Sequence, residues 1–139
     1  MGALVLLRVA AVLAAIQGLA HGGLFISARP RSDAEAAVVT AMRASQFFSG
    51  GSRSYWDLYF GYGLIAAAVC VVEAVLLWQL ARIATVQPVL ARPIVALFIA
   101  ANVGHAALVW RYFAFPIPIA FDLLIAGCLS WAFVSVARV

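Results

Sequence analysis

The chain has 139 residues, of which 67% are hydrophobic and only 10% are charged, and its mean hydropathy is +1.09. A soluble domain is about half apolar and about a quarter charged, so this chain lacks the polar residues needed to cover a core in water. The formal net charge is +4, and all nine basic residues are arginines that lie near the ends of apolar segments. We therefore expect an integral membrane protein whose partner is the lipid bilayer, with no nucleic-acid ligand.

The first apolar segment is predicted to be a helix over about residues 3–21, just long enough to cross a bilayer. Gly18-Leu19-Ala20 resembles the cleavage site of a signal peptide. No basic residue precedes the apolar run, however, and Arg8 falls inside it. These two features favour a membrane-spanning helix over a cleaved leader.

The connector that follows contains a second, shorter helix over about residues 33–48. Ser32 and Glu35 have the spacing of a capping box, and Pro30 lies just upstream. Apolar residues fall on one stripe of this segment, which predicts an amphipathic helix at the membrane interface. Gly50 and Gly51 then break the chain.

Three further apolar segments follow, and Ser54 with Asp57 forms a second capping box before the first of them. Proline pairs and short polar stretches separate these segments from one another. The predicted fold class is all-α: one domain over 1–139, a four-helix transmembrane bundle with up-down topology and a short amphipathic helix in the first connector. The three later membrane helices are predicted over about residues 55–83, 93–113 and 118–138.

The arginines divide almost evenly between the two membrane faces of this topology. One face carries Arg8, Arg82, Arg92 and Arg138, and the other carries Arg29, Arg31, Arg43, Arg53 and Arg111. In the positive-inside rule, arginines in a long connector carry less weight than arginines that flank a tight loop, such as Arg82 and Arg92. We therefore expect both termini to be cytoplasmic.

Polar side chains inside a membrane are costly, so each is a candidate for function. Depth along the helices places seven of them near the membrane face that carries the long connector: Gln17, His21, Tyr59, Tyr62, His105, Arg111 and Asp122. Helical spacing puts Glu73 on the same stripe as Tyr59 and Tyr62, and Asn102 on the same stripe as His105. They predict an interhelical pocket for a lipid or another small apolar ligand. The candidate ligand-binding residues are Gln17, His21, Tyr59, Tyr62, Glu73, Asn102 and His105.

Two acidic residues within the apolar segments allow more than one interpretation. Glu73 is paired with Arg8 at comparable depth, is a functional carboxyl group, or is satisfied by other groups; Arg8 could instead extend to the interface. Asp122 follows the prolines of the last turn, so it either caps the final helix or pairs with Arg111. For the histidines and tyrosines, the alternatives to ligand binding are interhelical hydrogen bonds and positions in the interfacial aromatic belt.

No cofactor and no metal site are predicted. His21 and His105 lack the close spacing of a metal-binding pair, and their depths do not match as haem ligation would require. Cys70 and Cys128 lie inside apolar segments and form no Cys-x-x-Cys motif, which excludes a thioredoxin-like site. Pairs of small residues such as Gly63 with Ala67 permit close helix packing within a subunit or in a homo-oligomer.

The residues at 41–47 and 51–64 carry a resemblance to a known family. Met42-Arg43, Phe47, Arg53-Ser54 and the run Asp57-Leu58-Tyr59-Phe60-Gly61-Tyr62-Gly63 resemble a pattern found in a family of small bacterial four-helix integral membrane proteins of unknown function. The resemblance covers roughly residues 15–82 and implies a four-helix fold in a bacterial inner membrane, but no activity. In architecture alone the chain is also similar to DoxX-like and sterol-isomerase-type proteins, and fold does not confer function.

Three functions remain open on the sequence alone. The first is a small membrane protein that binds a lipid or other apolar molecule in the predicted pocket. The second is a structural or accessory subunit whose polar side chains satisfy one another. The third is a membrane-embedded acid–base enzyme, such as a lipid isomerase, that uses Glu73 or His105.

Overall fold

The computed structural model describes residues 2–136, and these residues form helices joined by short connections, with no β-strand. Four of the helices are long and apolar enough to cross a membrane, and the fifth, α2, lies in the first connector. The predicted all-α fold with four membrane helices is therefore confirmed. The helices are α1 (Ala3–Ser27), α2 (Asp33–Ala44), α3 (Tyr55–Val86), α4 (Pro88–Tyr112) and α5 (Pro116–Val136).

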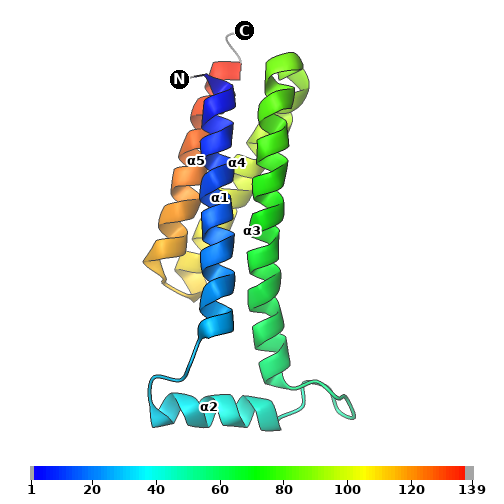
Figure 1. Ribbon diagram of the computed structural model, residues 1–139, viewed down its shortest axis with the longest axis vertical. Coiled ribbons are helices and arrows are strands. Elements are labelled where there is room, and N and C mark those ends of the chain that lie inside the picture. Colours follow the sequence, from blue (N-terminus) through cyan, green and yellow to red (C-terminus); the bar gives the residue numbers. More distant parts are fainter. Residues whose placement is uncertain (1, 137–139) are drawn as a thin grey trace. The chain divides into compact units, whose positions relative to one another are not determined.

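The chain divides into two compact units, and each is described by itself. The bundle unit contains residues 1–17 and 70–139, and the connector unit contains residues 18–69. Helices α1 and α3 contribute to both units, whereas α4 and α5 belong to the bundle unit alone. In the bundle unit successive long helices run in opposite directions (Figure 1). α3 and α4 are separated by Gln87 alone.

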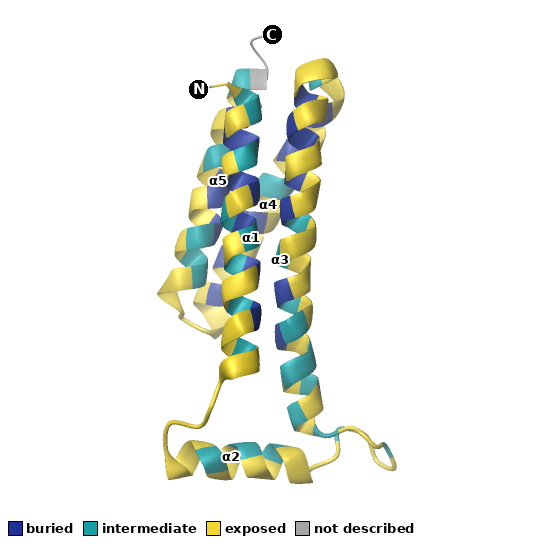
Figure 2. Ribbon diagram, in the orientation of Figure 1, coloured by how far each residue is buried: buried dark blue, intermediate teal, exposed yellow. Residues whose placement is uncertain are grey.

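The core of the bundle unit is built from all four of its helices. Each helix turns one stripe of residues inward and leaves the rest of its surface exposed (Figure 2). Alanines are frequent in this core, and small side chains let the helix backbones approach closely. The core residues that are no more than 3% exposed are Leu6, Leu7, Ala10, Ala11, Ala14, Leu77, Leu80, Ala81, Ala91, Val95, Ile125, Leu129 and Ala132.

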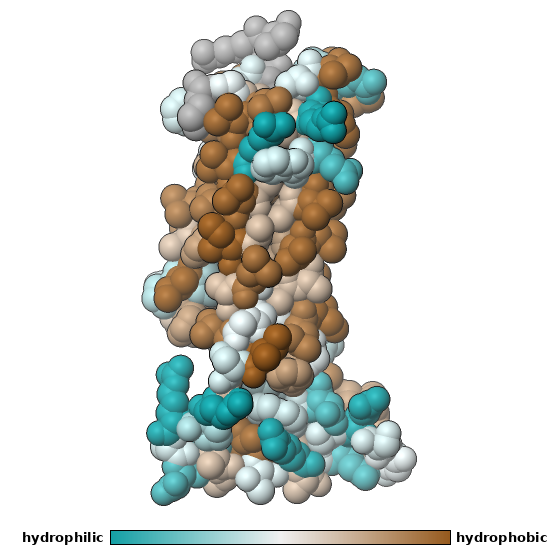
Figure 3. Space-filling model, viewed as in Figure 1, coloured by the Kyte–Doolittle hydropathy of each residue, from teal (hydrophilic) through white to brown (hydrophobic). Residues whose placement is uncertain are grey.

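The outer surface of the bundle unit is apolar. Large hydrophobic side chains such as Leu97, Trp110 and Leu124 are more than half exposed. Figure 3 shows mostly hydrophobic side chains over these helices, with hydrophilic groups toward the end where α3 passes into α4. Exposed apolar surface of this extent is unfavourable in water but is the ordinary surface of a helix bundle in lipid. The protein is accordingly a small multi-pass membrane protein.

Helix α1 continues to Ser27, past its predicted end near residue 21. Gly22 and Gly23, which follow the predicted end, both lie inside the helix. A Cβ atom on Gly22 would lie 3.3 Å from the Cβ of Ala67, so this glycine permits close packing of α1 on α3. The glycine at this position therefore allows two helices to pack closely and does not end the helix.

The ends of the other helices also differ from those predicted. α2 ends at Ala44 rather than near 48, because Ser45 is extended and Gln46 forms a β-bridge with Ser54. α4 starts at Pro88 rather than Pro93, since Pro88 occupies the first turn, where its missing N–H costs nothing. α3 extends to Val86, and α5 starts at Pro116, two residues before its predicted start. The predicted end of the last helix, near 138, lies outside the described residues.

Both predicted N-caps form in the connector unit, but only the second has the full capping-box pattern. The Glu35 carboxylate of the first accepts the N–H of Arg31 at 2.7 Å rather than that of Ser32. The hydroxyl of Ser32 accepts a hydrogen bond from the backbone N–H of Glu35 at 3.2 Å. The hydroxyl of Ser54 accepts one from the N–H of Asp57 at 3.2 Å, and the Asp57 carboxylate accepts the Ser54 N–H at 2.8 Å. These bonds satisfy N–H groups that the first turn of a helix leaves without partners.

We expect replacement of Leu77 by alanine to destabilise the protein by about 2–5 kcal/mol, because the side chain is fully buried and its loss leaves a cavity. Leu97→Ala is the matched control, since the Leu97 side chain is 68% exposed on the lipid-facing surface. Unfolding in mixed micelles with increasing SDS measures both variants. Equal effects of the two substitutions would contradict the assignment of the core.

Candidate functional site

A buried carboxyl group joins three helices of the bundle unit. Asp122 on α5 is 2% exposed. Its Oδ1 accepts a hydrogen bond from Nε2 of Gln17 on α1 at 3.0 Å. Its Oδ2 lies 2.8 Å from Nδ1 of His105 on α4. Each carboxylate oxygen of Asp122 therefore has a partner on a different helix.

The start of α5 explains why Asp122 points inward. With the helix beginning at Pro116, Asp122 is its seventh residue and lies beyond the first turn, so it cannot cap the helix. The alternative partner, Arg111, instead has its guanidinium carbon 5.4 Å from the ring centroid of Tyr112. Neither sequence interpretation of Asp122 holds. Asp122 was not among the predicted ligand-binding residues, although its predicted depth matched that of Gln17 and His105.

His105 links this buried acid to the outer surface of the bundle. Its side chain is 49% exposed, whereas that of Asp122 is 4% exposed. With a proton on Nδ1, the imidazole donates to Asp122 and leaves the lone pair of Nε2 as an acceptor. With both nitrogens protonated, Nε2 becomes a donor. Among residues 2–136, no side chain or backbone group hydrogen-bonds Nε2. The ring can therefore hold a hydroxyl or a carbonyl group of another molecule.

The second acid of the bundle unit, Glu73, is partly buried and is bound by an asparagine. Asn102 on α4 is 4% exposed. Its Nδ2 donates to Oε1 of Glu73 on α3 at 2.6 Å and to the backbone carbonyl of Phe98 at 2.9 Å. Both N–H groups of the amide are thus used. Asn102 and His105 lie three residues apart and therefore on one face of α4. Through them this face contacts Glu73 on α3 and Asp122 on α5.

Arg8 does not pair with Glu73, which was one of the three interpretations of that acid. The guanidinium carbon of Arg8 lies 4.9 Å from the ring centroid of Trp78. Glu73 is satisfied by Asn102 instead. An amide partner costs less desolvation than a second buried charge, which favours this arrangement inside a membrane.

The remaining candidates, His21, Tyr59 and Tyr62, lie in the connector unit. The Phe25 ring stands beside two of them, with its centroid 4.9 Å from that of His21 and 5.3 Å from that of Tyr59. Tyr62 is 65% exposed. Phe25 can occupy this place because Gly63 has no side chain, since a Cβ atom there would overlap the ring.

The seven predicted site residues therefore divide between the units. Gln17, Glu73, Asn102 and His105 lie in the bundle unit and form two hydrogen-bonded groups. The pocket that was predicted to combine all seven residues stays a prediction.

One open cavity lies in the bundle unit and another in the connector unit. The cavity of the bundle unit has a volume of about 330 Å³ and lies between α1 and α3. That of the connector unit has a volume of about 360 Å³ and is lined by Phe47, Phe48, Arg53, Ser54, Asp57 and Leu58. His105 lines neither of these two cavities, so a ligand held by it would lie against the outer surface of the bundle. Residues 2–136 contain no group of three or more His, Cys, Asp or Glu side chains placed to hold a metal ion.

Comparison of the chain with protein-family models, with curated proteins and with solved structures found no match.

A double-mutant cycle on Glu73→Leu and Asn102→Leu measures the hydrogen bond between α3 and α4. We expect a coupling free energy of about 0.6–1.7 kcal/mol, the range of interhelical hydrogen bonds in membranes. Either single variant leaves a buried polar group without its partner and should destabilise more than Ser130→Ala, whose hydroxyl bonds only its own helix. Additive effects of the two substitutions in SDS unfolding would contradict the hydrogen bond.

Proposed function

We propose that this protein binds a small apolar molecule that carries a hydroxyl or carbonyl group, and that His105 holds that group. The observation that carries the proposal is the half-exposed imidazole whose Nδ1 lies 2.8 Å from the buried carboxyl group of Asp122. In a bilayer no water competes for a hydrogen bond with Nε2. A ligand that supplies a donor to an acceptor Nε2, or an acceptor to a donor Nε2, therefore binds there with a favourable free energy. Lipids, sterols and quinones belong to this ligand class.

Asp122 and Gln17 support this role by orienting His105. A ring that turned freely would lose conformational entropy on binding, whereas a ring held through Nδ1 is already oriented. Asp122 is held in turn by Gln17, at 3.0 Å, and the three side chains come from three different helices. The surrounding exposed surface is apolar, which suits the hydrocarbon part of such a ligand.

An acid–base enzyme is the second candidate, and the same pair of residues favours it. A histidine bound by a buried carboxylate is a common arrangement for moving a proton at a substrate. If the bound molecule is a substrate, an isomer of it should accumulate with the unaltered protein and not with His105→Ala. A binding protein would return the molecule unchanged.

We also propose a location in a bacterial inner membrane with both termini cytoplasmic. The support for the membrane is the family resemblance, and the support for the orientation is the short connection between α3 and α4. Arg82 and Arg92 flank this connection, and tight loops weigh most in the positive-inside rule.

We expect His105→Ala to abolish co-purification of the apolar ligand. The protein is purified in a mild detergent and extracted with organic solvent, and the extract is analysed by mass spectrometry. Asp122→Asn should weaken retention by about tenfold, because the loss of one charge-assisted hydrogen bond loosens the ring. Ser130→Ala, on the surface of α5, is the control and should leave retention unchanged. A ligand retained equally by His105→Ala would contradict the proposal.

The orientation has its own measurement. A green fluorescent protein fused after residue 139 should fluoresce, and an alkaline phosphatase fused there should be inactive, because the first matures in the cytoplasm and the second only outside it. A phosphatase fused within the connector, after Ser49, should be active. The reverse pattern would show that the termini lie on the other side.

A further inference from the structure

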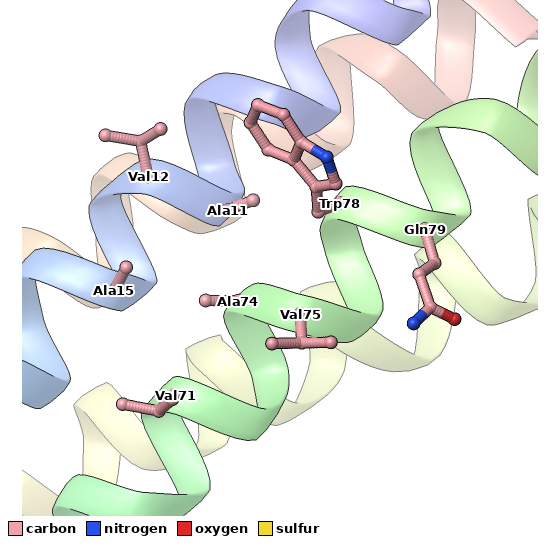
Figure 4. Close-up of a pocket in the computed structure, with 8 residues that line it drawn as sticks. All are labelled: Ala11, Val12, Ala15, Val71, Ala74, Val75, Trp78 and Gln79. Carbon is pink, nitrogen blue, oxygen red and sulfur yellow. The ribbon is translucent and has the colours of Figure 1, made fainter.

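A groove runs between α1 and α3 on the outside of the bundle unit, away from His105. Its volume is about 330 Å³. Ala11 and Ala74 form the buried floor and are 2% and 7% exposed, whereas Val12 and Val75 on the two rims are about half exposed. Figure 4 shows Ala11 on α1 and Ala74 on α3, each on the side of its helix that faces the other helix. The lining residues are Ala11, Val12, Ala15, Val71, Ala74, Val75, Trp78 and Gln79.

An arginine stands beside one end of this groove. Trp78 belongs to the lining, and the guanidinium carbon of Arg8 lies 4.9 Å from the centroid of the Trp78 ring. The Nε atom of Arg8 is buried and has no hydrogen-bond partner. In the described part of the chain no carboxylate forms a salt bridge with Arg8. A cation without a counter-charge in a membrane helix is costly, and a phosphate group would relieve that cost.

A second arginine adds positive charge at the same end of α3. Arg82 is exposed and lies one helical turn beyond Trp78, so it projects from the same side of the helix. Arg8 is the sixth residue of α1, about 8 Å along the axis from the first. This depth is close to that of phospholipid headgroups, where tryptophan and arginine are typical anchors.

We propose that the groove binds an anionic phospholipid, with one acyl chain between α1 and α3 and the phosphate against Arg8. From Trp78 to Val71 the lining extends about 10 Å along the helix axis, in the direction that an acyl chain takes into the bilayer. The groove and Arg8 thus match the two halves of such a lipid. Basic sites beside membrane helices commonly recognise anionic headgroups.

A second copy of the chain is a poorer occupant of the groove. In a symmetric dimer the same surface of each subunit meets its equivalent. Two copies packed in parallel through this groove would bring their Arg8 side chains to the same end, where like charges repel. An anionic lipid brings the opposite charge to that place.

Native mass spectrometry of the full-length protein tests the proposal. The protein is released from mixed micelles that contain equal amounts of phosphatidylglycerol and phosphatidylcholine with identical acyl chains. We expect preferential retention of phosphatidylglycerol, and a roughly fivefold smaller preference in Arg8→Gln, which is the effect of one arginine near a charged surface. Arg92→Gln is the matched control, because Arg92 also lies over an aromatic ring, that of Phe133, but away from the groove.

Ala15→Leu tests the place of the acyl chain. A larger side chain in the groove should lower retention of both lipids, whereas Ala96→Leu, on the exposed face of α4, should not. Circular dichroism and size-exclusion chromatography verify that each variant folds. If Arg8→Gln does not fold, a salt titration of the unaltered protein replaces it, and the preference for phosphatidylglycerol should fall as salt screens the charge.

Three results would overturn the proposal. The first is equal retention of the two lipids by the unaltered protein. The second is a loss of preference in Arg92→Gln as large as that in Arg8→Gln. The third is a dimer mass that Ala15→Leu abolishes without any change in lipid retention, which would assign the groove to a second copy of the chain.

Discussion

Asp122 receives hydrogen bonds from side chains on two other helices, and this contact fixes how three of the four long helices of the bundle unit meet. Within lipid there is no hydrophobic drive between helices, so close packing and interhelical hydrogen bonds must hold a bundle together. A carboxyl group that lost its partners at this depth would be left in an apolar interior at high cost. The positions of Gln17 and His105 are therefore set together with that of Asp122.

The same constraint accounts for the partner of Glu73 and for the alanine-rich core. The side-chain amide of Asn102 donates one hydrogen bond to Glu73 on α3 and another to a backbone carbonyl of its own helix. The small residues around it let the helices come close enough for such short side chains to reach. Polar pairing and small core residues thus depend on one another in this bundle.

The two proposed sites of the bundle unit, at His105 and at Arg8, differ in kind. His105 is held by a buried acid and presents one ring nitrogen outward, which suits a neutral group on an apolar ligand. Arg8 has an aromatic ring as its partner and stands at the end of an apolar groove, which suits an anionic headgroup. Arg8 and Gln17, which belongs to the His105 group, are nine residues apart on α1, about 14 Å along the axis. The two proposed sites therefore differ both in chemistry and in depth.

The amino-acid sequence by itself determined that this is a membrane protein with four spanning helices and a capped helix in the first connector. Those features depend on composition, segment length and local capping chemistry, which need no knowledge of neighbouring segments. It also identified Glu73, Asn102, His105 and Gln17 as polar residues that a membrane makes costly. It misjudged helix ends where a glycine or proline had a packing role, as with Gly22 against Ala67.

Only the tertiary structure decided which polar residues are partners. Asp122 was interpreted as a helix cap because the predicted start of α5 was two residues late. Arg8 was considered as a partner of Glu73 because depth alone cannot show which helices are neighbours. Helical periodicity places a side chain on a face of its own helix, but the rotation and order of the helices around the bundle determine what that face meets. Those quantities depend on contacts between residues far apart in the chain, such as Gln17 with Asp122.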